Sequence, residues 1–185
     1  VKNRLHGRVS DYADRVPGAV FLAGQRPWAV PVDVALPCAT QNELDGSDAQ
    51  TLVRNGVKCV AEGANMPSTL EAVKVFEESR VLYAPGKASN AGGVATSGLE
   101  MSQNSMRVCW LRDEVEDRLK QIMQSIHRSC VEAASEYGTP GNYVNGANIA
   151  GFTKVVDATH SIALIPKTGV SKLGKNTRCF LNLVK

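Results

Sequence analysis

Residues 87–100 (KASNAGGVATSGLE) combine glycines, small side chains and uncharged polar groups at a spacing that suits a ligand site. The stretch follows the apolar run 81–84 and precedes a helix-like segment, so we expect a turn between a strand and a helix. Glycines let the backbone approach a ligand closely, and a helix start offers unpaired N–H groups to an anion. Asn90 and Ser97 could hydrogen-bond to a polar group. The competing interpretation is a glycine-rich loop that binds no ligand.

Two further segments of similar chemistry follow apolar runs. Residues 37–42 (PCATQN) follow the run 32–36, and residues 62–67 (EGANMP) follow the run 57–61. In open α/β sheets, ligands bind beyond the carboxyl ends of the parallel strands. Small residues, amides and hydroxyls there suit a neutral, extended ligand such as a sugar or a nicotinamide carboxamide. They suit metal-dependent hydrolysis and Ser-His-Asp catalysis poorly, because no cluster of histidines and carboxylates accompanies them.

The elements that must position these segments are short strands alternating with helices. We expect strands at 19–22, 32–36, 57–61 and 81–84. The pairs Ser47/Gln50 and Ser68/Glu71 predict capping boxes at two helix starts. This order predicts an α/β fold, a partial Rossmann-like, doubly wound and mostly parallel sheet. C-terminal helices should follow, at 99–108, 115–131 and 147–164, with a loop at 138–148.

Composition and charge narrow the function classes. No apolar run approaches the roughly 20 residues of a membrane span. The chain carries a net charge of +3, but its last acidic residue is Asp157 and five basic residues follow Pro166. The rest of the chain is thus mildly acidic, and a nucleic-acid partner has no support outside this basic tail. Five widely spaced cysteines without a C-x-x-C pair, and no leader-like start, favour free thiols in the cytoplasm.

Four segments together carry a family resemblance: 36–43 (LPCATQNE), 61–67 (AEGANMP), 87–100 and 143–152 (YVNGANIAGF). They resemble hexameric glutamate dehydrogenases, most closely the NADP-dependent type, and the similarity runs from about Lys2 to about Ala158. The resemblance implies an oxidoreductase that converts L-glutamate reversibly to 2-oxoglutarate and ammonia. It implies NADP as cofactor and a homo-hexamer as the assembly of the intact protein.

The resemblance also implies cofactor-binding residues. Ala39 and Thr40 would line the path from adenosine to the nicotinamide ribose. Gly63 and Asn65 would lie beside that ribose, and Asn90 would hydrogen-bond the nicotinamide end. All five are small or uncharged residues that follow predicted strands.

On the substrate side, Val94 would pack against the methylenes and Ser97 would hydrogen-bond the side-chain carboxylate. The family's catalytic lysine and aspartate belong to an N-terminal domain that has no counterpart in this chain, and no G-x-G-x-x-G turn is present. We therefore assign no catalytic residue and no metal ligand. Residues 1–98 are predicted to be the second half of the coenzyme domain, 99–164 a C-terminal helical segment and 165–185 a disordered basic tail.

Two functions are compatible with these patterns. The chain is either part of an active glutamate dehydrogenase or a truncated, non-catalytic module. Alone it should be inactive in both cases, because the acid–base groups are missing.

Overall fold

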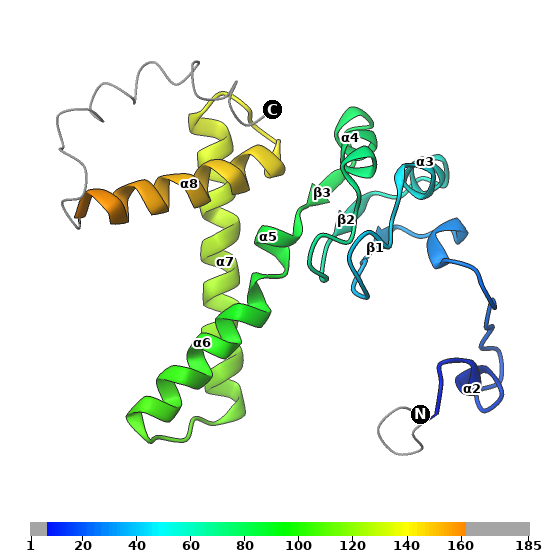
Figure 1. The fold of residues 1–185 in the computed structure, drawn as a ribbon, viewed down its shortest axis with the longest axis horizontal. Coiled ribbons are helices and arrows are strands. Elements are labelled where there is room, and N and C mark those ends of the chain that lie inside the picture. Colours follow the sequence, from blue (N-terminus) through cyan, green and yellow to red (C-terminus); the bar gives the residue numbers. More distant parts are fainter. Residues whose placement is uncertain (1–6, 162–185) are drawn as a thin grey trace. The chain divides into compact units, whose positions relative to one another are not determined.

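The computed structural model describes residues 7–161 (Figure 1). They divide into two units between Asn90 and Ala91. This division lies upstream of the boundary at residue 98 that the sequence predicts. The predicted tail at 165–185 lies outside the described residues.

The first unit is built around three short strands. Its elements in chain order are α2 (Ser10–Ala13), the 3₁₀ helix η1 (Pro27–Ala29), β1 (Val34–Ala35), α3 (Gly46–Arg54), β2 (Cys59–Ala61), α4 (Leu70–Glu78), β3 (Leu82–Ala84) and α5 (Gly86–Ser89). The strands form one parallel sheet in the order β1-β2-β3. The predicted α/β class and parallel pairing are confirmed for these three strands.

The two faces of this sheet differ in burial. Ala35, Val60 and Tyr83 are paired in register and are all buried. Phe76 of α4 stacks on Tyr83 with 5.5 Å between ring centroids, so this face forms the core of the unit. On the other face, Val34 and Leu82 are 51% and 70% exposed.

The predicted capping boxes Ser47/Gln50 and Ser68/Glu71 are wrong, because Asp45 and Thr69 cap the starts of α3 and α4. Asp45 accepts hydrogen bonds from the N–H groups of Ser47 and Asp48, and the Asp48 carboxylate accepts one from the Asp45 N–H. The capping box therefore begins at Asp45, because an ionised carboxylate satisfies the free N–H groups of a helix start well. For α4 the cap is Thr69, whose hydroxyl accepts from the Ala72 N–H.

The prediction of a strand at residues 19–22 is wrong. These residues have no regular structure, and Val20 is 80% exposed. An apolar run forms a strand only where a neighbouring strand can pair with it, and within residues 7–161 no strand pairs with this one. The chain that follows is held instead by Trp28, which is buried and donates from Nε1 to the Glu43 carbonyl at 3.1 Å.

The second unit is helical, with α6 (Ala91–Met106), α7 (Arg112–Glu136) and α8 (Tyr143–Ser161). The long helix α7 packs against both others (Figure 1). Helix α8 begins earlier than predicted, because the Asn142 side chain accepts a hydrogen bond from the Asn145 N–H at 2.9 Å and caps its first turn. Small residues line the α7–α8 contact: Cys130, Ala134, Gly146 and Ala147.

Candidate functional site

Three chain segments meet at the carboxyl edge of the sheet in the first unit. They are residues 36–44 after β1, 62–69 after β2 and 85–90 after β3. The N–H groups of Gly63 and Ala64 donate to the Pro37 carbonyl at 2.9 and 3.1 Å, which joins the first two segments. The Asn90 side chain donates from Nδ2 to the Ala64 carbonyl at 2.9 Å, which joins the third. The fold thus brings together five of the predicted site residues: Ala39, Thr40, Gly63, Asn65 and Asn90.

A carboxylate shapes the first segment. Glu43 accepts hydrogen bonds from the N–H groups of Ala39 and Thr40, at 2.7 and 3.3 Å. Both residues are exposed and stand at the surface of this turn. Since their N–H groups are already bonded, Thr40 can meet a ligand through its hydroxyl and its carbonyl.

The second segment approaches the first very closely. A Cβ atom placed on Gly63 would lie 2.5 Å from Cys38 Sγ, so this position has room only for glycine unless that side chain moves. Asn42 and Met66 both have positive φ angles, 55° and 50°, and the Asn42 N–H donates to the Met66 carbonyl at 3.0 Å. Left-handed backbone at non-glycine residues costs of order 1–3 kcal/mol, and such strain clusters at functional sites.

The third segment is a single helical turn, α5, that ends at Asn90. Gly86 is buried at its start, and a Cβ there would lie 3.0 Å from the Ala64 carbonyl oxygen and 3.2 Å from Glu62 Oε2. The Ser89 hydroxyl lies 2.6 Å from the Glu62 carbonyl oxygen, to which it donates. These contacts place Asn90 against the second segment.

A buried carboxylate lies at the centre of the edge, and the sequence analysis did not identify it as a site residue. Glu62 is only 4% exposed. Its Oε1 accepts from the Tyr83 hydroxyl at 2.6 Å and the Ser68 N–H at 3.3 Å, and its Oε2 accepts from the Gly86 N–H at 2.6 Å. Burial, and then the hydrogen bond to Glu62, raise the pKa of Tyr83, so its hydroxyl remains a donor. An acidic residue directly after a buried strand was the available signal.

The two predicted substrate residues lie in the second unit. Val94 and Ser97 are exposed residues of α6, three positions apart and therefore on one side of the helix. Residues 87–100 are helical on both sides of Asn90, so the glycine-rich turn expected there is not formed. The glycines of α6 have no positive φ angle. Gly92 instead lets α6 approach α7, since a Cβ there would lie 3.5 Å from Leu119 and Met123.

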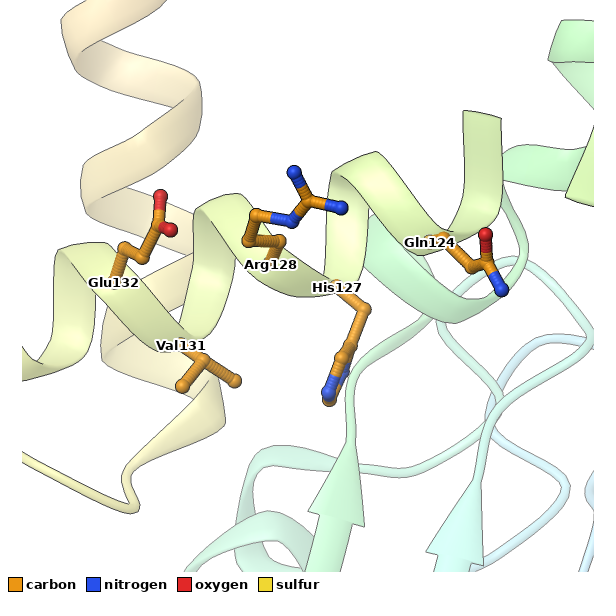
Figure 2. A pocket seen from close by; sticks show the side chains of 5 residues that line it. All are labelled: Gln124, His127, Arg128, Val131 and Glu132. Atoms are coloured by element: carbon orange, nitrogen blue, oxygen red, sulfur yellow. The ribbon is translucent and has the colours of Figure 1, made fainter. Parts of the chain in front are cut away.

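A separate hollow of about 500 Å³ lies along α7 (Figure 2). All its lining residues come from this one helix: Gln124, His127, Arg128, Val131 and Glu132. His127 is exposed, and its Nδ1 lies 3.4 Å from the Tyr143 hydroxyl oxygen. Burial raises the pKa of the Tyr143 hydroxyl to about 12. The hollow contains none of the predicted site residues.

Other kinds of site find no support in residues 7–161. No group of three or more histidines, cysteines and carboxylates in this range could hold a metal ion. No helix in the described part of the chain has both the length and the apolar character needed to cross a bilayer.

Comparison with known proteins places these features in a family. A family model described as glutamate/leucine/phenylalanine/valine dehydrogenase matches residues 1–162. The chain is 60% identical over 158 residues to the NADP-specific glutamate dehydrogenase of Escherichia coli, covering 85% of this chain and 35% of that protein. It is 57% identical over 150 residues to the NAD-specific glutamate dehydrogenase of Bacteroides fragilis, covering 81% of this chain and 34% of that protein.

A solved structure gives the same result for the fold. The crystal structure of Plasmodium falciparum glutamate dehydrogenase matches with a TM-score of 0.83 and 44% identity, over 87% of this chain and 35% of that one. This chain therefore spans about a third of the length of the relatives it matches.

Proposed function

The chain belongs to the glutamate/leucine/phenylalanine/valine dehydrogenase family, and we propose that it is the part of an NADP-dependent glutamate dehydrogenase that holds the nicotinamide end of the cofactor. The intact protein would convert L-glutamate reversibly to 2-oxoglutarate and ammonia. The observation that carries this proposal is that the three segments after β1, β2 and β3 are joined by hydrogen bonds at one edge of the sheet. Uncharged polar groups lie at this edge, and the backbones of the segments approach one another closely.

The chemistry of this edge fits a nicotinamide nucleotide. Gly63 and Gly86 have no space for a Cβ, so they keep the backbone of the second and third segments close together. The Asn90 amide is held by its Nδ2 atom, which leaves Oδ1 as the acceptor for a carboxamide N–H group. When bound, NADP accepts or supplies the hydride, and the protein supplies binding and orientation.

Each cofactor residue has a role in this proposal. Asn90 hydrogen-bonds the nicotinamide, and Gly63 and Asn65 lie beside its ribose. Ala39 and Thr40 line the path toward the adenosine. The exposure of Ala39, Thr40, Gly63 and Asn65 supports these roles, because a ligand can reach them.

The substrate residues come from the second unit. Val94 is 79% exposed and would pack against the methylenes of glutamate, and Ser97 would hydrogen-bond its side-chain carboxylate. The acid–base groups of the reaction would come from a part of the protein outside this chain. In the domain scheme, residues 1–98 contribute to the coenzyme domain, 99–164 form a helical segment and 165–185 a basic tail.

The preference for NADP, the assembly and the location rest on the family resemblance. The residues that would read the 2′-phosphate are outside the matched motifs. The preference for NADP is therefore supported by the name of the similar E. coli protein. A homo-hexamer and a cytoplasmic location complete the proposal.

The test uses the full-length protein that carries this chain. Incubated with L-glutamate and NADP⁺, it should form NADPH, and 2-oxoglutarate with ammonium should reverse the reaction. NAD⁺ tests the cofactor preference, and L-leucine, L-phenylalanine and L-valine test the other substrates of the family. Formation of NADPH with one of these three but not with glutamate would overturn the proposed substrate. The 185-residue chain alone should give no turnover.

A further inference from the structure

Glu62 bonds to the second and third segments of the proposed nicotinamide site, although its own side chain is buried. It is 4% exposed, whereas the adjacent Gly63 is exposed. Its N–H donates to the Ala84 carbonyl at 3.1 Å and its carbonyl accepts from the Ser89 hydroxyl at 2.6 Å. With the three hydrogen bonds to its carboxylate, one residue thus bonds to β3, to both ends of α5 and to the second segment.

These bonds control two groups that would touch the cofactor. The bonds to Gly86 and Ser89 set where α5 lies, and Asn90 directly follows that turn. The main chain of Glu62 leads directly into Gly63. A displacement of the Glu62 side chain would therefore shift Asn90 relative to Gly63, although neither loses its own polar groups.

The hydrogen-bond donors around the Glu62 side chain require a carboxylate at this position. All three bonds to the side chain come from uncharged donors, two backbone N–H groups and one phenol. A carboxylate has enough lone pairs to accept all three. The side-chain amide of a Glu62→Gln variant would instead direct its NH₂ group at a donor, so at least one buried donor would lose its acceptor.

We propose that Glu62 is a positioning residue for the cofactor, whose buried carboxylate sets the distance between Gly63 and Asn90. This inference rests on the proposed function. The carboxylate makes no contact with the reacting atoms, and its effect passes through α5 and the main chain of residue 63.

The experiment compares three variants of the full-length protein. Glu62→Gln should raise the KM for NADP⁺ by about tenfold, as expected when a buried donor loses its acceptor. The KM for glutamate should change by less than about threefold, because the substrate residues lie on α6. Glu78→Gln, an exposed residue in the last turn of α4, is the matched control and should leave both constants unchanged.

A rise in the KM for NADP⁺ without a matching rise in the KM for glutamate distinguishes a positioning role from simple destabilisation of the fold. A purely structural role would lower the active fraction, and hence kcat, with both KM values unchanged, and that result would overturn the inference. If Glu62→Gln does not fold, Tyr83→Phe decides, because it removes one donor and leaves the carboxylate bonded to the backbone. Its KM for NADP⁺ should rise by about twofold to threefold, and an unchanged value would overturn the inference. Absence of glutamate-dependent NADPH formation by the unaltered protein would instead refute the proposed function.

Discussion

The strand-end edge of the first unit and the α7–α8 contact of the second are both closely packed, but they are held by different forces. At the edge, side-chain carboxylates and hydroxyls bond to backbone groups, and Glu62 is the main example. At the helix contact, small residues let two backbones approach, and Gly146 lies directly against the Cys130 carbonyl. Polar bonds fix directions and therefore suit a ligand site, whereas close apolar packing contributes stability.

Gly146→Ala should have the largest effect on stability. Its Cβ would overlap the Cys130 carbonyl, so α7 and α8 would have to separate. We expect a loss of about 2–3 kcal/mol in the free energy of unfolding, measured by urea denaturation followed by helical circular dichroism. Gly151→Ala in the same helix is the control, because no atom of the described residues lies within 4 Å of its Cβ position. That variant should be stabilised by up to about 1 kcal/mol, and equal losses in both would refute the packing argument.

Gly86→Ala tests the edge and should cost less, about 1–2 kcal/mol. Its Cβ would lie 3.0 Å from the Ala64 carbonyl oxygen and 3.3 Å from Asn90 Nδ2, so the second and third segments would move apart. In the full-length protein the same change should weaken NADPH binding, followed by the fluorescence of the bound nucleotide. Weaker binding without any change in stability would show that the glycine contacts the cofactor itself.

Gly63→Ala should cost at most about 1 kcal/mol, because the atom it meets is the end of a side chain. The new Cβ would lie 2.5 Å from Cys38 Sγ, and rotation of that side chain can relieve the contact. The double variant Cys38→Ala/Gly63→Ala should therefore lose less stability than the two single changes combined. A double-mutant cycle measures this coupling, and strictly additive losses would contradict it.

The smallest effect concerns pH and the cap of α3. Hydrogen bonds from the Asp48 N–H and Ser47, with a contribution from Arg26, lower the pKa of Asp45 to about 2. A lowered pKa in the folded state gives stability that is present above the unfolded value, about 4 for aspartate, and is lost as the pH falls toward about 2. Asp45→Asn should thus be less stable than the parent at neutral pH, with the difference shrinking below about pH 4. Thermal melts across this range measure it, and a difference that is independent of pH would contradict it.

Three of the four predicted strands and the helices between them could be predicted from the sequence, because each has a local signal. Short β-branched runs bounded by glycine or proline marked β1, β2 and β3. The run at 19–22 has the same local signal and forms no strand, since pairing depends on a neighbour that the local sequence does not specify. The prediction of a turn at residues 87–100 was wrong for a related reason, because it also depended on contacts distant in sequence. Gly92 lies within α6 and lets that helix pack closely on α7.

The sequence by itself determined the α/β class, the family and the residue types at each strand end, since these depend on local pattern and on extended motifs. The tertiary structure alone decided how the strand ends are joined. Glu62 directly follows β2, but its partners Tyr83, Gly86 and Ser89 come more than twenty positions later and reach it only because β2 and β3 pair in parallel. Pairing of strands distant in sequence is a property of the folded sheet, and for that reason the partners of this carboxylate were visible only in the structure.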